Sequence, residues 1–282
     1  MRYAKYHGLG NDYIVLNSSD FSESLDSARV KRICDRNLGV GSDGIVLLER
    51  CLDGDRFLVR VFNPDGSEAE NSGNGMRIMS RYLYDHGYVK DQPFTLLVKG
   101  TRSVGAQVID PCSLIRVDMG GATFNSLEIP MRGTEREVVG ELLKLDDLEL
   151  NVTCVSVGNP HCVVVGRGAK RQDALEIGPL IERHELFPRR TNVQFVEVID
   201  RGTIAIEIWE RGAGYTIASG SSASAAASAC HRLGLVDRQV SVRMVGGELK
   251  IELDERYQVR LSGPVTRVAQ GFIDPEAFEW MS

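Results

Sequence analysis

The sequence lacks the patterns that mark metal sites and membrane spans. Its 6 cysteines include no C-x-x-C pair and its 5 histidines include no H-E-x-x-H spacing, so we expect neither a structural zinc site nor any other metal. No apolar run approaches the roughly 18 residues that a membrane helix needs, and the first residues contain no apolar signal segment. We therefore expect a soluble, cytoplasmic protein in a reducing compartment.

A basic stripe is also absent. Lys and Arg number 33 against 39 Asp and Glu, which gives a formal net charge of −6, so nucleic acid is a poor candidate for a partner. Hydrophobic residues make up 43% and charged residues 26% of the chain, a balance that excludes disordered and fibrous classes. At about 150 residues per domain, a length of 282 residues favours two domains.

The second half of the chain repeats features of the first half. The aligned pairs include Phe62 with Trp209, Ser72 with Ser219, Gly73 with Gly220 and Gly87 with Gly234. Further upstream, after a one-residue indel, G-N-P-H-C-V falls on G-N-D-Y-I-V. Each half has the same order of strand, Gly-rich turn, helix and final glycine. Such a repeat indicates that the fold consists of two similar units.

Hydrophobic periodicity predicts the strand and the helix of each repeat. Ile204, Ile206 and Ile208 alternate with other residues, as in a strand with one buried face. In the first half, Met76, Met79 and Leu83 share one face of a helix, with Gly87 just past its end. In the second, residues 223–229 are nearly all Ala and Ser before Gly234. Further strands are expected at 57–62, 96–98, 115–117, 163–165 and 249–253.

These elements predict an α+β protein made of two similar halves, each a mainly antiparallel sheet around a central helix. We place the boundary near Met119, Gly120 and Gly121. The first half is expected to comprise residues 1–118 and 265–282, because the short C-terminal segment returns a strand to the first sheet, and the second half residues 119–264.

Both Gly-rich turns open a helix with Ser and Gly. The first N–H groups of a helix have no intrahelical partner and lie at the positive end of the helix dipole, so each turn is suited to a carboxylate or phosphate. Alternatively, Ser72 and Ser219 are only N-caps. Two such turns at matching places favour a ligand shared by the halves.

Several stretches resemble the diaminopimelate epimerase family and follow its order along essentially the whole chain. They are H-G-L-G-N-D-Y, F-N-P-D-G-S-E-A-E-N-S-G-N-G, G-N-P-H-C, T-N-V-Q-F, E-R-G-A-G-Y-T-I-A-S-G-S-S and V-A-Q-G-F-I. The resemblance implies two pseudo-symmetric domains, each a barrel-like sheet around a helix, with the active site in the cleft between them. Such enzymes invert an amino-acid Cα without pyridoxal phosphate or metal, because one thiolate removes the α-proton while a thiol on the opposite face supplies another.

Four positions depart from the family pattern. Ser72 and Ser219 replace the two catalytic cysteines, Tyr215 replaces a glutamate, and Gly44 replaces a frequent glutamine. A hydroxyl is a far weaker acid than a thiol, whose pKa is about 8.5. Three explanations stay open: an engineered double mutant that traps substrate, a divergent epimerase whose hydroxyls are activated by His161 and Glu210, or a protein with another proton shift or only binding.

The resemblance assigns roles to the remaining motif residues. His161 matches the histidine that serves the first catalytic position, Ser72, and Glu210 matches the carboxylate that serves the second, Ser219. The alternatives are a histidine that closes a turn and a solvated acid at a strand end. Hydrogen bonds from the serines to these partners would follow the logic of an activated nucleophile and base, applied here to proton transfer.

Substrate binding is expected from a second set of residues. The resemblance implies that asparagines hold the distal amino and carboxyl groups, although a lone asparagine is more often a turn former. Arg211 would pair with the distal carboxylate. Backbone N–H groups of two helix starts would hold the α-carboxylate and meet the charge that develops on the enolate. The asparagines are Asn11, Asn63, Asn159 and Asn192, and the helix-start residues are Gly73, Asn74, Gly220 and Ser221. Tyr215 could be an acid, a pocket wall or plain packing.

The sequence thus predicts a cofactor-independent isomerase that exchanges a Cα proton between two bases. As an epimerase it would convert LL- to meso-diaminopimelate for lysine and cell-wall synthesis. The alternatives are an isomerase of an unsaturated carboxylic acid on the same fold and a catalytically silent binder of amino acids. The expected partner is a small amino-acid substrate, with no membrane or nucleic acid. Family members often dimerise, so a homodimer is also expected.

Overall fold

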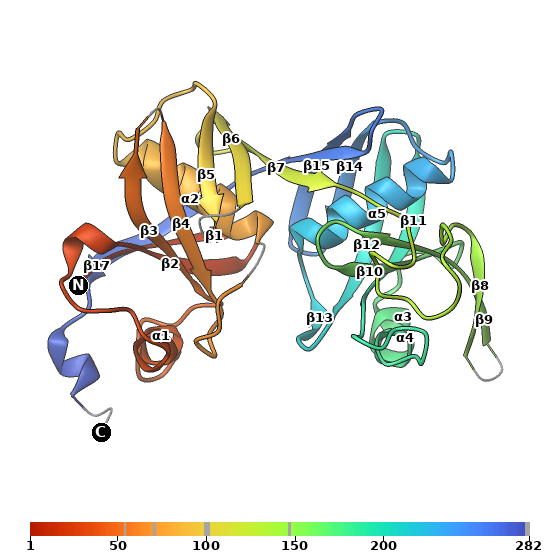
Figure 1. Ribbon diagram of the computed structural model, residues 1–282, viewed down its shortest axis with the longest axis horizontal. Helices are drawn as coiled ribbons and strands as arrows, with labels where there is room; N and C mark the ends of the chain where they lie inside the picture. The colour runs from red at the N-terminus through yellow and green to blue at the C-terminus, as the bar shows by residue number, and fades with distance from the viewer. Residues whose placement is uncertain (54, 70–71, 99–101, 146–147, 280–282) are drawn as a thin grey trace. The chain divides into compact units, whose positions relative to one another are not determined.

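The chain folds into two compact units, each described here by itself (Figure 1). The computed structural model describes residues 1–53, 55–69, 72–98, 102–145 and 148–279. The first unit comprises Met1–Val117 and Gly263–Ser282, and the second comprises Asp118–Ser262. The first unit therefore contains both ends of the chain, and the second is one continuous segment.

The sheet of the first unit runs in the order β17, β1, β2, β3, β4, β5, β6 and β7. These strands are β17 (Thr266–Phe272), β1 (Arg2–Gly8), β2 (Asn11–Asn17), β3 (Ile45–Leu52), β4 (Arg56–Phe62), β5 (Phe94–Val98), β6 (Arg102–Asp110) and β7 (Leu114–Gly121). The pairs β2–β3 and β4–β5 are parallel, and the other neighbours are antiparallel. The sheet is therefore mixed, with mostly antiparallel pairs.

The sheet of the second unit has the same sequence of pairings. Its order is β8, β9, β10, β11, β12, β14, β15 and β16, with the parallel pairs β10–β11 and β12–β14 at the same places. The strands are β8 (Glu141–Leu145), β9 (Leu148–Ser156), β10 (Pro160–Val165), β11 (Asn192–Asp200), β12 (Thr203–Glu210), β13 (Gly214–Thr216), β14 (Gln239–Met244), β15 (Gly247–Leu253) and β16 (Gln258–Gly263). This shared order confirms the internal repeat. The short β13, which pairs with β12, was not expected.

Each sheet wraps around one central helix (Figure 1). Helix α2 (Gly73–Asp85) follows β4 and contacts β1, β2, β3 and β6, whereas α5 (Gly220–Arg232) follows β13 and contacts the equivalent β9, β10, β11 and β15. The other helical segments are η1 (Ser18–Asp20), α1 (Ser27–Cys34), α3 (Arg171–Glu176), α4 (Gly178–Glu182) and η2 (Pro275–Phe278). The expected α+β fold with two pseudo-symmetric halves is thus confirmed.

The ends of both central helices agree with the sequence. Ser72 is the N-cap of α2 and Ser219 is the N-cap of α5. Past the C-terminal ends, Gly87 and Gly234 adopt φ values of 73° and 74°, in the left-handed region where glycine has no Cβ penalty. Each serine therefore marks the start of the central helix of its unit.

Helix α5 is buried on nearly every side because its side chains are small. Its run of Ala and Ser lets the surrounding strands approach closely, while the hydroxyls must find partners inside the core. Ser224 Oγ donates to the Gly220 carbonyl at 2.8 Å, and Ser228 Oγ donates to the Ser224 carbonyl at 2.7 Å. These bonds satisfy the hydroxyls within the helix itself.

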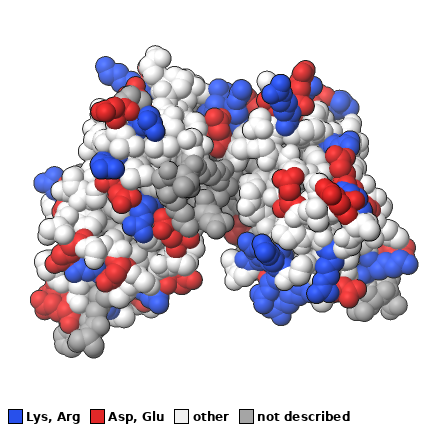
Figure 2. Space-filling view, viewed as in Figure 1, with Lys and Arg blue, Asp and Glu red and all other residues white. Residues whose placement is uncertain are grey.

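The surface mixes charges of both signs. Figure 2 shows Lys and Arg interspersed with Asp and Glu over each unit on the face that it presents. Some of them pair, as Arg136 does with Glu141 at 2.6 Å and Arg201 with Asp237 at 2.6 Å. Within the described ranges, no helix combines the length and apolar character needed to cross a membrane, and no cluster of His, Cys, Asp and Glu could hold a metal ion.

Candidate functional site

Ser72 presents its hydroxyl at the N-terminal end of α2. Its Oγ accepts a hydrogen bond from the Gly75 backbone N–H at 3.0 Å and lies 3.2 Å from the hydroxyl of Tyr13, which comes from β2. Gly73 and Asn74 begin the helix and are buried. The free N–H groups of this first turn and the helix dipole favour negative charge at the serine.

A chain of hydrogen bonds ties Asn11 and Asn74 to the scaffold. The guanidinium of Arg77 donates to Asn74 Oδ1, Asn74 Nδ2 donates to Asn11 Oδ1, and Asn11 Nδ2 donates to Asp43 Oδ2, each at 2.9 Å. Arg77 is fully buried, and burial lowers its pKa to about 10. Two expected binding residues are thus brought together, and each still has hydrogen-bonding capacity for a ligand.

Asn63 forms a turn. Its backbone N–H donates to the Ser67 carbonyl at 2.8 Å, and its side-chain amide donates to Ser67 Oγ at 2.9 Å. The structure therefore gives Asn63 the turn-forming role that was the alternative to substrate binding, and its expected binding role stays a prediction.

Ser219 occupies in the second unit the place that Ser72 has in the first, and Glu210 is its expected partner. Ser219 Oγ lies 3.4 Å from both the Ser222 backbone N–H and Ser221 Oγ, and it hydrogen-bonds the Glu210 carboxyl group. Burial raises the pKa of Glu210 above its ordinary value of 4.5, and the hydrogen bond from Ser219 opposes this shift. Ser219 therefore lies beside a carboxyl group suited to proton transfer, and the catalytic pairing of Ser219 with Glu210 stays a prediction.

His161 is held as a buried, neutral ring. Its Nε2 lies 3.0 Å from Asn159 Oδ1, and its Nδ1 lies 3.0 Å from the amide nitrogen of Gln194. Desolvation lowers the pKa of His161 to about 3. Gln194 also donates to Ser222 Oγ at 3.0 Å, so the histidine is connected to the first turn of α5. His161 and Ser72 belong to different units, and their expected pairing stays a prediction.

Asn192 joins two strands next to Glu210. Its Oδ1 accepts a hydrogen bond from the Arg211 backbone N–H, and its Nδ2 donates to the Pro160 carbonyl, both at 2.9 Å. The Arg211 side chain is exposed and donates to the Arg189 carbonyl at 3.2 Å. The asparagine therefore fixes the loop that carries Arg211, while most of the guanidinium fork is available to a carboxylate.

The surroundings of Gly44 and Tyr215, two of the departures from the family pattern, explain which side chains fit there. A Cβ at Gly44 would lie 2.6 Å from the Phe62 carbonyl oxygen and 2.7 Å from the Tyr13 ring, so a side chain does not fit there. Tyr215 donates to Glu207 at 2.7 Å and packs against the core of the second unit. Of the three roles left open for Tyr215, packing is the one for which contacts are observed.

We call the residues around Ser72 and those around Ser219 the two half-sites. The sequence analysis did not identify three of their side chains, namely Tyr13, Arg77 and Gln194. Each of them lies in or near a motif that the sequence analysis had identified. Tyr13 ends H-G-L-G-N-D-Y, Gln194 lies within T-N-V-Q-F, and Arg77 lies three residues after Asn74, at helical spacing. The contacts of Tyr13 and Gln194 join distant segments, however, and spacing alone does not reveal such contacts. For Arg77, the useful signal was a charged residue on an otherwise buried helix.

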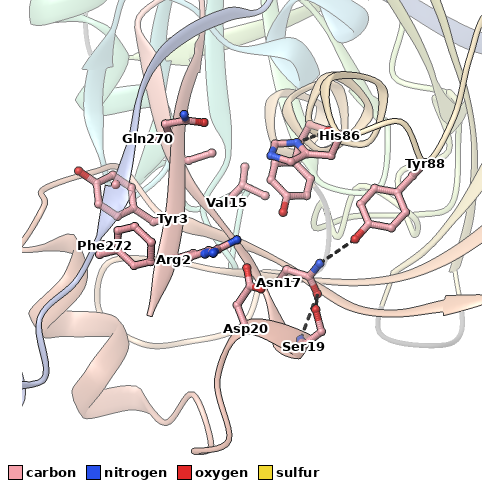
Figure 3. Close-up of a pocket in the computed structure, with 13 residues that line it drawn as sticks. Arg2, Tyr3, Val15, Asn17, Ser19, Asp20, His86, Tyr88, Gln270 and Phe272 are labelled. Atoms are coloured by element: carbon pink, nitrogen blue, oxygen red, sulfur yellow. Dashed lines mark hydrogen bonds between the residues drawn. The ribbon is translucent and has the colours of Figure 1, made fainter.

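A hollow of about 600 Å³ lies at the opposite end of α2 from Ser72 (Figure 3). Tyr82 and His86 from that helix end, Tyr3 and Phe272 from β1 and β17, and Tyr88 line part of it. The hydroxyl of Tyr88 accepts a hydrogen bond from Asn17 at 3.1 Å. None of the expected site residues lines this hollow, so it is separate from the half-site at Ser72.

Comparisons with known proteins point in one direction. A family model described as diaminopimelate epimerase matches residues 3–125 and 153–268. The chain is 46% identical over 278 residues to diaminopimelate epimerase 2 of Nostoc sp. strain PCC 7120, covering 99% of this chain and 97% of that protein. It is 44% identical over 276 residues to diaminopimelate epimerase of Desulforudis audaxviator, covering 96% and 98%.

A solved structure shares the fold at much lower identity. The crystal structure of a probable proline racemase from Agrobacterium radiobacter K84 matches with a TM-score of 0.69 and 15% identity, over 99% of this chain and 94% of that chain. At this identity the match bears on architecture alone. It agrees with the repeated topology seen here.

Proposed function

The chain belongs to the diaminopimelate epimerase family, and from this premise we propose that it inverts the Cα of diaminopimelate or a related amino acid by exchanging a proton between two bases. In the proposed reaction one base removes the α-proton and an acid on the opposite face of Cα supplies another. The family activity would convert the LL isomer to the meso isomer for lysine and cell-wall synthesis. Members of the family named above are isomerases, and this chain is assigned to the same enzyme class.

One observation supports the proposal above all others. Each repeat places a serine hydroxyl at the N-cap of its central buried helix, at equivalent points of one repeated topology. A hydroxyl in this place lies beside unpaired backbone N–H groups that can hold an α-carboxylate and stabilise the charge of an enolate. The same N–H groups of Gly73, Asn74, Gly220 and Ser221 are therefore proposed to orient the reacting carbon.

The proposed base on one side is the Glu210 and Ser219 pair. When Ser219 Oγ takes the α-proton, its own proton passes to the Glu210 carboxylate, so no free alkoxide accumulates. The raised pKa of Glu210 makes it a stronger base than an ordinary carboxylate, which compensates in part for the missing thiol. On the other side Ser72 is the proposed acid, with His161 as its family partner.

The distal end of the substrate is proposed to bind the polar groups around these serines. Arg211 offers a forked pair of donors to a carboxylate, and Asn11, Asn63, Asn159 and Asn192 offer amide groups to the amino and carboxyl groups. An amino acid with a second charged end satisfies this set better than a simple unsaturated acid does. These polar residues therefore favour an amino-acid epimerase over an isomerase of an unsaturated carboxylic acid.

The test is proton exchange in deuterium oxide. The wild-type protein is incubated with LL- and meso-diaminopimelate, with other amino acids and with unsaturated carboxylic acids, and loss of the Cα proton is followed by nuclear magnetic resonance. We expect exchange and appearance of the opposite epimer with diaminopimelate, and in Ser219→Ala loss of the opposite epimer and of the exchange that passes through Ser219. Movement of a double bond in an unsaturated acid would support the alternative isomerase, and calorimetric binding without exchange would support a silent binder.

We also propose a cytoplasmic homodimer, which the family resemblance favours. Sedimentation equilibrium over a range of concentrations tests the oligomeric state, and cell fractionation tests the location. A protein that sediments as a monomer at all concentrations would contradict the dimer without affecting the proposed chemistry.

A further inference from the structure

We propose that Tyr13 is the proton partner of Ser72, supplying the proton that this serine gives to the substrate and taking back the proton that it removes. The inference rests on the proposed function, because it concerns how the first half-site performs its share of the exchange. Tyr13 acts through Ser72, so it is a positioning and proton-sharing residue rather than one that contacts the reacting carbon.

The hydrogen-bond geometry at Ser72 suits such a relay. Tyr13 Oη lies 3.2 Å from Ser72 Oγ, and the same Oγ accepts from the Gly75 backbone N–H at 3.0 Å. A hydroxyl has two acceptor sites and one proton, so Ser72 can accept from both groups and still direct its own proton outward. The order phenol, hydroxyl and substrate then forms a continuous path for a proton.

The phenol supplies what a serine lacks. Ser72 alone would have to become an alkoxide after giving up its proton, whereas a tyrosine ionises with an ordinary pKa of about 10, close to that of a thiol at about 8.5. In the forward step the Ser72 O–H bond breaks as a C–H bond forms, and the Tyr13 O–H bond breaks as the Ser72 O–H bond is restored. The charge comes to lie on the phenolate, and the reverse step returns both protons.

Gly44 makes room for the Tyr13 ring. A Cβ at this position would lie 2.7 Å from Tyr13 Cε1 and 2.6 Å from the Phe62 carbonyl oxygen, closer than real Cβ contacts come without displacement. Any side chain at position 44 would therefore push the ring away from its present place. Two departures from the family pattern, Gly44 and Ser72, thus meet at one side chain, which has only 8% of its surface exposed.

The proposal is tested by a double-mutant cycle. Wild type, Tyr13→Phe, Ser72→Cys and the double variant are compared for washout of the Cα proton of LL- and meso-diaminopimelate in deuterium oxide. We expect Tyr13→Phe to slow washout about tenfold or more when residue 72 is serine, but by less than about twofold when it is cysteine, because a thiol ionises without help. The loss should affect the isomer whose proton Ser72 removes.

The pH profile adds a readout that a packing role would not change. With serine at position 72, the washout rate should rise with pH as the phenol ionises, and Tyr13→Phe should remove this rise. Tyr6→Phe is the matched control, because the Tyr6 hydroxyl donates to Asp85 at 3.0 Å and Tyr6 is a buried tyrosine of the same unit. Melting temperatures of all variants show whether the fold is kept.

Each result separates this inference from the function on which it rests. Equal losses in the serine and cysteine backgrounds would mean that Tyr13 only packs, and an unchanged rate in Tyr13→Phe would mean that Ser72 works without it; both outcomes overturn the inference alone. Absence of Cα exchange in the wild type with every amino acid tried would overturn the proposed function itself.

Discussion

The Nδ1 atom of His161 lies 3.0 Å from the side-chain nitrogen of Gln194, and both side chains are fully buried. Since the second ring nitrogen faces Asn159 Oδ1, the natural assignment is a neutral ring that carries its proton on Nε2. Adding a second proton would replace the acceptor at Nδ1 by a donor facing another donor. Burial is the largest cause that holds the ring in its neutral state.

This charge state makes the stability of the protein sensitive to mild acid. The folded pKa of about 3 lies below the ordinary 6.5, so below pH 6.5 the unfolded chain takes up a proton that the folded chain refuses. The stability that the neutral His161 contributes is fully present above pH 6.5 and is lost as the pH falls toward 3. Between pH 7 and pH 5 we expect His161 to contribute a loss of about 2 kcal/mol.

Urea unfolding at the two pH values measures this contribution. The variant His161→Gln has no titrating ring, so its loss of unfolding free energy over the same interval should be smaller than that of the wild type. Equal pH dependence in the two proteins would show that the ring titrates at an ordinary pKa when folded.

Replacing Glu210 by glutamine should abolish most of the exchange that passes through Ser219. Removal of a general base typically costs about 10²- to 10⁴-fold in rate, and Glu210→Gln cannot accept the proton. In the wild type the base must be ionised, so kcat/KM should rise with pH through a pKa above the ordinary 4.5 of a glutamate. Glu210→Gln should lose this acid limb.

A matched control lies on the same strand. Glu207 belongs to β12 like Glu210, but its carboxylate accepts from the Tyr215 hydroxyl. Glu207→Gln should keep both the rate and the acid limb. A similar loss in both variants would assign the effect to the strand rather than to the base.

Restoring thiols at both helix starts should raise the activity. The variant with Ser72→Cys and Ser219→Cys keeps the helix N-termini and Glu210, while each acid gains a pKa near 8.5. A rate gain of about tenfold needs only about 1.4 kcal/mol at the transition state, so we expect at least that much in diaminopimelate epimerisation. Ser224→Cys, on the same helix α5 but bonded to the Gly220 carbonyl, should give no gain. If the double variant binds substrate but exchanges protons no faster, other residues of the pocket, rather than the two missing thiols, limit the reaction.

Gly178 is expected to tolerate no side chain. A Cβ there would lie 2.7 Å from Trp209 Cβ and 2.8 Å from Trp209 Cγ, and the indole is held by its hydrogen bond to Glu182 at 2.7 Å. We expect Gly178→Ala to lower the free energy of unfolding by about 1–3 kcal/mol through overpacking. Gly202→Ala, whose nearest neighbour is Asp200 Oδ1 at 3.5 Å, should change it little, and thermal unfolding of both variants decides the matter.

Local signals made much of the fold predictable. Ser72 and Gly87 bracket the first helix, and Ser219 and Gly234 bracket the second, because caps depend on a few adjacent backbone groups. Once the repeat was recognised, the order of one half predicted that of the other. Strand partners were harder, since pairing joins distant segments and leaves no mark in either one alone.

The candidate site was predictable to the extent that it lies in motifs. The family resemblance predicts the pairing of Ser219 with Glu210, and Ser219 acts on the pKa of the Glu210 carboxyl group through a hydrogen bond, while their catalytic roles stay predictions. The hydrogen bonds of Tyr13 to Ser72 and of Gln194 to His161 did not follow, because each depends on the three-dimensional path of two elements. Asn63 shows the reverse case, since a motif residue has a local turn role that its motif did not reveal.

The pairing of β17 with β1 has a consequence for how the protein is made. Strand β1 is synthesised long before its antiparallel partner β17 at Thr266–Phe272, because the whole second unit lies between them in the chain. The edge of β1 that faces β17 therefore stays unpaired while the second unit is synthesised, whereas the strands of the second unit, a continuous segment, are all available before β17 emerges. An open strand edge is prone to pair with other chains, so the nascent protein is most exposed to aggregation in the interval before β17 emerges.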